Sequence, residues 1–314
     1  RWAVSGENGR ASADLMAASK GDELVVYLDY RKPYRFGQLL SFYRSREMVG
    51  VEKVGDSAYQ RTVRMPSKDG EVLGWVRVTD DVDNSRLVLA MSPSLQTVSS
   101  QVIARVRRQF DVGCDPDAVC CGIASLDDVV PGAALNGTRL PGAFDPFEIS
   151  MRAVLGQQIS VRAANKLAFR IVSTYGKPVD TGIEGLDRAS LTVDDVLGFE
   201  DIEAAFGELG VIKTRSRTIR AIAAALKAGE LSFDAAADAA EQIDNLLAIK
   251  GIGPWSANYI AMRALSYPDA FLETDAGIKH ALPGYTPKQR LELAEQWRPW
   301  RSYANICLWN SLAG

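Results

Sequence analysis

Residues 246–259 form the part of this sequence best suited to bind a phosphate. An amphipathic segment ends at Ile249, the turn Gly251-Ile252-Gly253 follows, and Pro254 opens a second predicted helix. Glycine allows a tight turn and a close approach to a ligand, and proline suits the first helical position. Backbone N–H groups at the positive end of a helix would then point to one spot, where a phosphate fits. A bare G-x-G is more often a plain helix–helix corner, but the flanking helices and the apolar Ile252 strengthen the motif.

Two carboxylates, Glu273 and Asp275, follow about twenty residues beyond this turn. Asp275 precedes the predicted helix Ala276–Leu282, so its local sequence is typical of an N-cap, which is the commoner role of such an aspartate. Local sequence alone therefore does not make Asp275 a catalytic residue.

The composition is that of an ordinary globular protein of 314 residues, long enough for two or three modest domains. No stretch approaches the ~20 apolar residues of a membrane helix, so no membrane association is expected. The four cysteines form no C-x-x-C pair and His280 is the single histidine, which excludes the usual zinc and iron–sulfur patterns and predicts no metal centre. Residues 1–21 are predicted to be a tail, a processed end or a piece of a longer polypeptide.

Positive charge is segregated along the chain although the net charge is −3. Residues 149–179 and 209–229 carry basic residues without any acid, whereas residues 180–208 are strongly acidic. This pattern fits one basic face on an acidic body, which would bind a phosphate backbone. Solvated helix faces are the simpler alternative. The basic residues are Arg152, Arg162, Lys166, Arg170 and Lys177 in the first segment and Lys213, Arg215, Arg217, Arg220 and Lys227 in the second.

The elements that must position these residues change type near Pro93. Before it, a short apolar run, a helical pattern from Tyr34 to Met48 and three strand-like segments predict an antiparallel sheet with one helix packed on it. After it, helical patterns dominate. The predicted strands are Leu24–Leu28, Tyr59–Met65, Val72–Val78 and Leu87–Met91, and the predicted helices after Pro93 are Ser99–Phe110, Pro146–Leu155, Val161–Tyr175, Lys213–Ala228, Phe233–Ala240, Glu241–Ile249, Pro254–Leu265, Ala276–Leu282, Pro287–Trp297 and Tyr303–Leu312.

Several motifs in order make the chain resemble a known family. Residues 246–259 resemble the hairpin of the helix-hairpin-helix DNA glycosylases, whose signature adds an aspartate where Asp275 stands. The segments 31–34, 140–148, 152–161 and 297–304 resemble the alkylation-repair branch, the 3-methyladenine DNA glycosylase II family, so the likeness covers about residues 22–314.

The resemblance implies a mainly α fold with an N-terminal α+β domain, and two helical halves around a cleft. Residues 22–95 would form the antiparallel-sheet domain and residues 136–267 the helical domain with the hairpin. Residues 96–135 and 268–314 would together form the second helical half, which carries the catalytic aspartate.

The same resemblance assigns catalysis to Asp275. Breaking an N-glycosidic bond leaves a cationic sugar, and a carboxylate beneath C1′ stabilises that transition state. The bifunctional relatives place a Schiff-base lysine two residues after the second hairpin glycine. Trp255 occupies this position and Lys250 does not match it, so a monofunctional enzyme without strand cleavage is expected.

Trp255, Tyr259, Trp309 and Phe42 match the aromatic lining of the family's base pocket. Aromatic faces attract cationic alkylated purines such as 3-methyladenine and 7-methylguanine. Any one of these residues taken alone is more often part of the core, and the set together favours a base pocket. Gly251, Ile252 and Gly253 are expected to contact DNA, as are Gln157 and Gln158 of the loop that supplies the family's wedge. Gln158 stands where relatives have an apolar residue, so Gln157, Gln158 and Ile159 are all candidates for the wedge.

No cofactor is expected, except that relatives can hold a monovalent cation on hairpin carbonyls, here roughly those of Leu247, Ile249 and Ile252. The expected partner is double-stranded DNA with damaged bases, bound by a cytoplasmic monomer that would be nucleoid-associated in a bacterium. Two alternatives remain open. One is a glycosylase for oxidised or mismatched bases, and the other is a non-catalytic helix-hairpin-helix DNA-binding protein.

Overall fold

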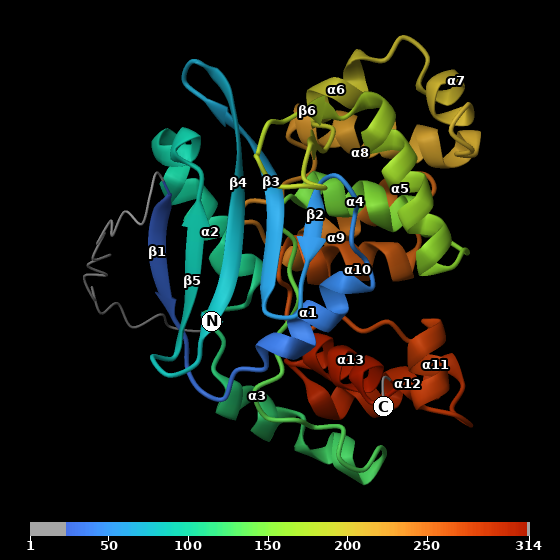
Figure 1. Cartoon of the computed structure of the whole chain (residues 1–314). Helices are drawn as coiled ribbons and strands as arrows, with labels where there is room; N and C mark the ends of the chain where they lie inside the picture. The colour runs from blue at the N-terminus through green and yellow to red at the C-terminus, as the bar shows by residue number, and fades with distance from the viewer. Residues whose placement is uncertain (1–22, 313–314) are drawn as a thin grey trace.

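The structure is a computed structural model that describes residues 23–312, and a five-stranded antiparallel sheet forms its N-terminal part (Figure 1). The strand order is β1-β5-β4-β3-β2, so the first strand pairs with the last. The strands are β1 (Leu24–Asp29), β2 (Glu52–Val54), β3 (Ala58–Ser67), β4 (Gly70–Asp81) and β5 (Arg86–Met91). The four predicted strands are confirmed, and β2 is too short to show an alternating pattern.

The central hairpin of the sheet follows from its residues. The register of β3 and β4 runs from Ala58 opposite Thr79 to Ser67 opposite Gly70. Gly70 has φ +118, a backbone conformation that residues with a Cβ atom rarely adopt, so a glycine closes the turn. Buried valines from both strands, such as Val63 and Val76, give the sheet its apolar face.

Helix α1 (Phe36–Arg44) joins the sheet to the rest of the molecule. Phe36, Leu39, Leu40 and Tyr43 are buried, at the spacing that predicted the helix. The Tyr43 hydroxyl donates to the carbonyl oxygen of Gln109 at 2.7 Å. This contact fixes the helix that carries Phe42.

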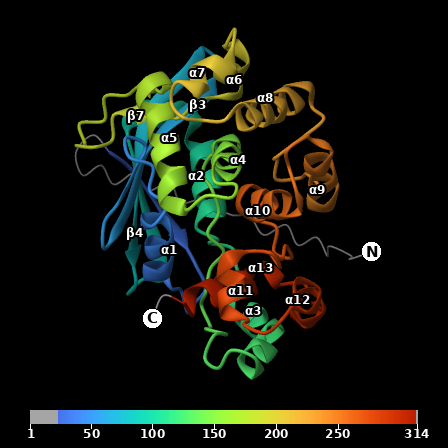
Figure 2. The ribbon, with the colours of Figure 1, turned by 90° about the vertical axis from the view of Figure 1, so that its right-hand side faces the viewer.

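Helices make up most of the chain after the sheet (Figures 1 and 2). They are η1 (Pro93–Val98), α2 (Ser99–Gln109), α3 (Pro116–Gly122), η2 (Ala124–Asp128), α4 (Pro146–Leu155), α5 (Val161–Tyr175), α6 (Val193–Gly198), α7 (Ile202–Gly207), α8 (Lys213–Ala228), α9 (Ala239–Ala248), α10 (Pro254–Ala264), α11 (Ala276–Ala281), α12 (Pro287–Ala294), η3 (Glu295–Trp297) and α13 (Arg301–Asn310). A two-stranded ribbon of β6 (Lys177–Pro178) and β7 (Arg188–Ala189) follows α5.

Helix α4 is the centre of the helical part, because α5, α8 and α10 all pack against it (Figure 2). Eight of its ten residues are buried, and α10 is likewise buried over most of its length. A helix that is apolar nearly all round belongs in a core. Asp145 begins α4 by accepting hydrogen bonds from the amides of Phe147 and Glu148, at 2.8 and 3.0 Å.

Residues 110–128 lie against the C-terminal helices. The Tyr303 hydroxyl donates to Asp111 at 2.8 Å, and η2 contacts η3. A side chain at Gly122 would approach Trp300 to 2.3 Å, so the two segments are in close contact. Phe110, at the end of α2, also packs on Tyr43 and Tyr59 of the sheet part. The division at residue 96 therefore stays a prediction.

One predicted helix is wrong, and three α-helices, α3, α6 and α7, and the short 3-10 helices η1 and η2 were not predicted. Residues 233–238 form a loop in place of the expected helix Phe233–Ala240, because Asp238 caps α9 by accepting from the amides of Ala240 and Glu241. Helices α6 and α7 lie in the acidic segment, where each is six residues long and has a capping side chain, Thr192 or Asp201. Such short helices carry little periodic signal.

Among residues 23–312 no helix is both long and apolar enough to cross a membrane. The four cysteines are free thiols. The predicted tail, residues 1–21, lies outside the described residues.

Candidate active site

A cavity of about 580 Å³ lies between α1, the α4–α5 loop and the helices α5, α10, α11 and α13. Its volume falls in the range of small-molecule pockets. It brings together all five residues that the sequence assigned to catalysis and base binding: Asp275, Trp255, Tyr259, Trp309 and Phe42. Asp275 is the one carboxylate among the described lining residues, and the alternative, Glu273, does not line the cavity.

Asp275 is both the N-cap of α11 and a pocket residue. Its Oδ1 accepts from the amides of Gly277 and Ile278 at 2.8 and 3.2 Å, and from Nε1 of Trp309 at 2.9 Å. Its Oδ2 accepts from Nε1 of Trp255 at 3.1 Å. The four N–H groups fix the position of the carboxylate. With one donor on Oδ2, that oxygen keeps acceptor capacity for a further partner.

The four aromatic residues form two stacked pairs. The rings of Trp255 and Tyr259 lie 5.0 Å apart with an interplanar angle of 8°, one helical turn apart on α10. The rings of Phe42 and Trp309 lie 6.1 Å apart at 24°, although they come from α1 and α13. The pocket therefore has two electron-rich aromatic walls and a carboxylate hydrogen-bonded to both of its tryptophans.

Sequence reasoning missed two arginines of the pocket, Arg46 and Arg263. The Arg46 guanidinium lies 3.9 Å from the ring centre of Phe42 and 5.8 Å from that of Trp309. Arg263 donates to the hydroxyl of Tyr259 at 2.6 Å and lies 4.8 Å from the Phe42 ring. Each arginine stands four residues after a pocket aromatic, Phe42 or Tyr259, and this helical spacing could have identified both.

These cations change the electrostatics of the pocket. Burial would raise the pKa of Tyr259, but the guanidinium groups of Arg263, Arg46 and Arg152 outweigh it and lower that pKa. Burial also lowers the pKa of Arg46. Positive charge thus gathers beside Phe42 and Tyr259.

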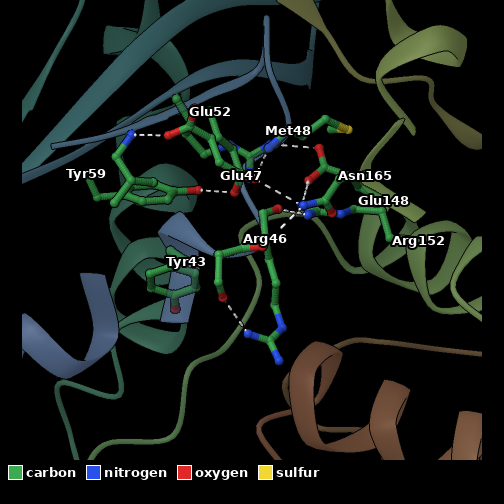
Figure 3. Close-up of polar contacts among 12 residues, drawn as sticks. Tyr43, Arg46, Glu47, Met48, Glu52, Tyr59, Glu148, Arg152 and Asn165 are labelled. Carbon is green, nitrogen blue, oxygen red and sulfur yellow. Dashed lines mark hydrogen bonds and ion pairs between the residues drawn. The ribbon is translucent and has the colours of Figure 1, made fainter. Parts of the chain in front are cut away.

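A buried ion cluster supports the segment that carries Arg46 (Figure 3). Arg152 of α4 pairs with Glu52 at 3.0 Å and donates to the carbonyl oxygen of Arg46. Glu52 also accepts from the Tyr59 hydroxyl at 2.6 Å and from the amide of Met48 at 3.1 Å. Burial alone would raise the pKa of Glu52, but the charge of Arg152 leads the contacts that lower it. The sheet is thereby bonded to α4 beside the pocket.

The predicted hairpin joins α9 to α10. Gly251 has φ +97, and a Cβ there would lie 2.1 Å from Oγ1 of Thr218. Gly253 is the N-cap of α10 with φ −102, and a Cβ there would meet nothing within 4 Å. No side chain caps α10, and within residues 23–312 no acceptor is bonded to the amides of Gly251 or Gly253. These donors suit an external anion. Ile252 is buried and its amide donates to Ile249, so its side chain belongs to the core.

The α4–α5 loop lies beside this hairpin. Gln157 donates to the carbonyl oxygen of Gly251 at 2.9 Å and to the Ser256 hydroxyl at 3.0 Å, which makes it a brace between loop and hairpin. Gln158 is exposed with φ +56, and Ile159 is 36% exposed and lines the pocket. Of the three wedge candidates, Gln158 and Ile159 have side chains that remain available.

The predicted basic face is smaller than the sequence suggested. Arg217 pairs with Glu203 at 2.6 Å and Lys227 pairs with Asp194 at 2.7 Å. Acidic residues of the segment 180–208 therefore neutralise part of the positive charge of the segment 209–229. Five others bond to acids or carbonyl oxygens: Arg152, Arg170, Lys177, Arg215 and Arg220. Arg162, Lys166 and Lys213 have no ion pair among the residues that the structure describes.

Comparisons with known proteins agree with this geometry. Residues 25–145 match the family model of the AlkA N-terminal domain. DNA-3-methyladenine glycosylase 2 of Escherichia coli is 35% identical over 282 residues, which is 90% of this chain and 95% of the relative. A Mycobacterium tuberculosis relative, named as a probable bifunctional transcriptional activator/DNA repair enzyme AlkA, is 35% identical over 310 residues, and the match covers 96% of this chain and 60% of that relative.

Solved structures give the fold. The 3-methyladenine DNA glycosylase of Archaeoglobus fulgidus superposes with a TM-score of 0.75 at 18% identity, over 90% of this chain and 97% of that one. A Clostridium acetobutylicum 8-oxoguanine glycosylase/lyase superposes with a TM-score of 0.56 at 17% identity, over 84% of this chain and 99% of that one. The helix-hairpin-helix glycosylase fold expected from the sequence is confirmed. The chain belongs to the AlkA family of DNA-3-methyladenine glycosylases.

Proposed function

We propose that this protein excises alkylated bases from duplex DNA, by flipping the damaged nucleotide into the cavity and hydrolysing its N-glycosidic bond with Asp275. The observation that carries the proposal is the convergence of Asp275 and two stacked aromatic pairs on one cavity. A non-catalytic DNA-binding protein would need the hairpin but not this convergence. The Escherichia coli relative is named for 3-methyladenine, and that lesion, like 7-methylguanine, is a cationic purine of the kind that aromatic walls attract.

The chemistry follows from the position of the charge. When the C1′–N bond breaks, its electron pair goes to the base nitrogen and neutralises the cationic base, which therefore needs no general acid. The sugar is left as an oxocarbenium ion, and the Asp275 carboxylate stabilises it. Water then supplies a hydroxyl to C1′ and releases a proton. Opposite charges at a separation of ~4 Å in an effective dielectric of ~20 attract by about 4 kcal/mol, which corresponds to a rate factor of about 10³.

The product is an abasic site in an intact strand. Trp255 occupies the hairpin position at which a lyase needs an amine, and its indole donates to Asp275. Lys250 is exposed and does not line the cavity. No Schiff base can therefore form from a hairpin lysine beside the sugar.

A monovalent cation on the hairpin carbonyls is part of the same proposal. Side chains of Thr218 and Gln157 already donate to the carbonyl oxygens of Lys250 and Gly251. No hydrogen bond reaches the carbonyl oxygens of Leu247 and Ile252 from the described residues. These two oxygens could join that of Ile249 around a cation, which would add positive charge where the phosphate binds. We also expect the enzyme to act as a monomer in the compartment that holds the DNA, because one chain completes the pocket.

Base release from duplexes with one defined lesion tests the proposal. The substrates carry 3-methyladenine, 7-methylguanine or 8-oxoguanine, and the variants are Asp275→Asn and, as a matched carboxylate control, Glu273→Gln. Asparagine also caps helices, so Asp275→Asn removes the charge and keeps the start of α11. We expect release of the alkylated bases, a loss of about 10³-fold for Asp275→Asn, and little change for Glu273→Gln.

Several outcomes would overturn the proposal. Asp275→Asn at near parental single-turnover rates would leave Asp275 a helix cap only. Preferred release of 8-oxoguanine would move the enzyme to the oxidised-base alternative. A protein–DNA adduct trapped by borohydride would contradict the monofunctional mechanism.

A further inference from the structure

A second groove, of about 710 Å³, opens directly from the lesion pocket. It lies between the end of α1 with the loop after it and the first half of α5. The pocket and the groove share the lining residues Ser45, Arg46, Val161 and Asn165. Asn165 donates to the carbonyl oxygen of Ser45 at 3.3 Å and so holds the two sides of the groove together at this junction. We call it the α5 groove.

The α5 groove is positively charged. Four cations line it, Arg44, Arg46, Arg162 and Lys166, against one acid, Glu47. The Glu47 carboxylate already accepts from the amide of Val54 at 2.6 Å. Arg44 pairs with Asp56, whose side chain is fully exposed, and such surface pairs contribute little and are screened by salt.

Arg162 and Lys166 are the cations of the α5 groove that most need a ligand. Both are exposed, and neither has an ion pair within residues 23–312. They stand four residues apart on α5, where like charges repel and destabilise a helix slightly. No acidic side chain among residues 23–312 pairs with these two cations, whereas an anion bound between them would remove the repulsion.

Exposed apolar side chains continue along the same path. Val49, Val161 and Phe169 line the groove and are 52%, 46% and 42% exposed. Val161 and Phe169 lie eight residues apart on one face of α5, a distance of about 12 Å. One strand of B-DNA advances ~3.4 Å per nucleotide, so this length spans roughly three nucleotides. Cations beside apolar surface suit phosphates beside deoxyribose and base faces.

We propose that the α5 groove binds the DNA backbone on one flank of the flipped nucleotide, with Arg162 and Lys166 each neutralising a phosphate. This inference rests on the proposed function. The hairpin and α10 lie on one side of the α4–α5 loop, and α5 and α1 lie on the other (Figure 2). The DNA is thus held on both sides of the lesion, by backbone amides at the hairpin and by side-chain cations in the groove. An acidic protein segment is the alternative ligand, and the test below excludes one of the two.

The salt dependence of DNA binding tests the proposal. The test variant is Arg162→Ala/Lys166→Ala. Its control is Lys68→Ala/Arg107→Ala, which removes the same charge from two exposed residues that line neither the pocket nor the groove. Affinity for an undamaged duplex is measured by fluorescence anisotropy from 50 to 200 mM salt. Single-turnover base release is measured at saturating enzyme.

Each lost phosphate contact lowers the slope of log K against log salt by about 0.9, so the test variant should lose about 1.8. Over this fourfold range of salt its affinity should fall about twelvefold less than that of the parent. The control should keep the parental slope and the parental rate of base release. The test variant should need a higher enzyme concentration than the parent to reach its maximal single-turnover rate. Phe169→Ala should weaken binding without changing the slope.

Duplexes with the lesion near one or the other end locate the contact. The difference in salt slope between the parent and the test variant should disappear when the duplex on one flank of the lesion is removed. It should persist when the duplex on the other flank is removed. A test variant with the slope of the control would overturn the proposal and favour a protein ligand. A slope difference that persists on both truncated duplexes would overturn the placement of the contact on one flank of the lesion. A parent that releases no alkylated base would refute the proposed function itself. The test variant should fold like the parent, because removing two charges that repel each other does not destabilise α5.

Discussion

The two hairpin glycines allow the phosphate-binding role of the hairpin to be separated from its structural role. Gly251→Ala places a methyl group 2.1 Å from Oγ1 of Thr218 and keeps φ at +97. The backbone strain is on the order of 1–3 kcal/mol. Thr218 must also turn away and lose its hydrogen bond to the carbonyl oxygen of Lys250, a further loss of about 1 kcal/mol. We therefore expect Gly251→Ala to lower the melting temperature by roughly 5–15 °C.

Gly253→Ala should behave in the opposite way. The new methyl group meets nothing within 4 Å and φ is −102, so only a modest N-cap preference is lost, about 1 kcal/mol or less. On the outer face the same methyl group lies where a phosphate must approach the free amides. A lost hydrogen bond to a charged group is worth about 1.5–3 kcal/mol, which weakens affinity roughly 10- to 150-fold.

Thermal unfolding and anisotropy with damaged and undamaged duplexes measure these effects. Gly253→Ala should weaken both complexes by the same factor and leave the salt slope nearly unchanged, because backbone amides release few counterions. If Gly253→Ala bound undamaged duplex as tightly as the parent, the hairpin would be a structural corner and the phosphate argument would be refuted.

Three further predictions concern the pocket and the core. Trp309→Ala removes a stacking partner of Phe42 and a hydrogen-bond donor to Asp275. The single-turnover rate of base excision should therefore fall roughly 30- to 2000-fold, while the affinity for undamaged duplex stays the same. Trp309→Phe keeps an aromatic ring and should lose less of the excision rate in the same assay. Arg46→Met removes a cation from the face of Phe42, which leaves that face free to attract a cationic base. The half-saturating enzyme concentration for DNA with cationic 7-methylguanine should therefore drop roughly 2- to 30-fold. A similar drop for DNA with uncharged 1,N6-ethenoadenine would contradict the electrostatic explanation. Burial raises the pKa of Asp111 to about 6, so the folded state binds more protons than the unfolded state between pH 4 and 6 and stability falls as pH rises through this window. Asp111→Asn removes this pH-dependent loss of stability. In urea denaturation, the free energy of unfolding of the variant relative to that of the parent should rise by about 3 kcal/mol from pH 4 to pH 7. If this difference in unfolding free energy did not change with pH, Asp111 would not titrate in this window.

The sequence predicted the pocket more completely than the surface around it. Asp275, Trp255, Tyr259, Trp309 and Phe42 come from four helices, yet all five line one cavity, because the family motifs supplied the long-range contacts that periodicity cannot. Arg46 and Arg263 were missed because the resemblance drew attention to aromatic residues, although helical spacing places each arginine beside one of them.

The surface charge was harder to predict, because pairing across the chain is invisible in a linear pattern. Arg217 and Lys227 stood out as basic, but the intervening acidic segment folds back as α6 and α7 and pairs with them. The loop at residues 233–238 was mistaken for a helix for a related reason: its alanines favour a helix, while Asp238 begins the next one.

The double role of Asp275 has a consequence for how fast the enzyme can respond to a flipped base. The bonds that start α11 and the two indole N–H groups hold the carboxylate before any substrate arrives. Its dipolar surroundings therefore need no rearrangement as the sugar becomes cationic, and such preorganisation is usually the largest single contribution to enzymatic rate enhancement. The carboxylate can move away from the sugar only if the first turn of α11 opens. A side-chain movement that would inactivate the enzyme therefore also costs the hydrogen bonds that start this helix.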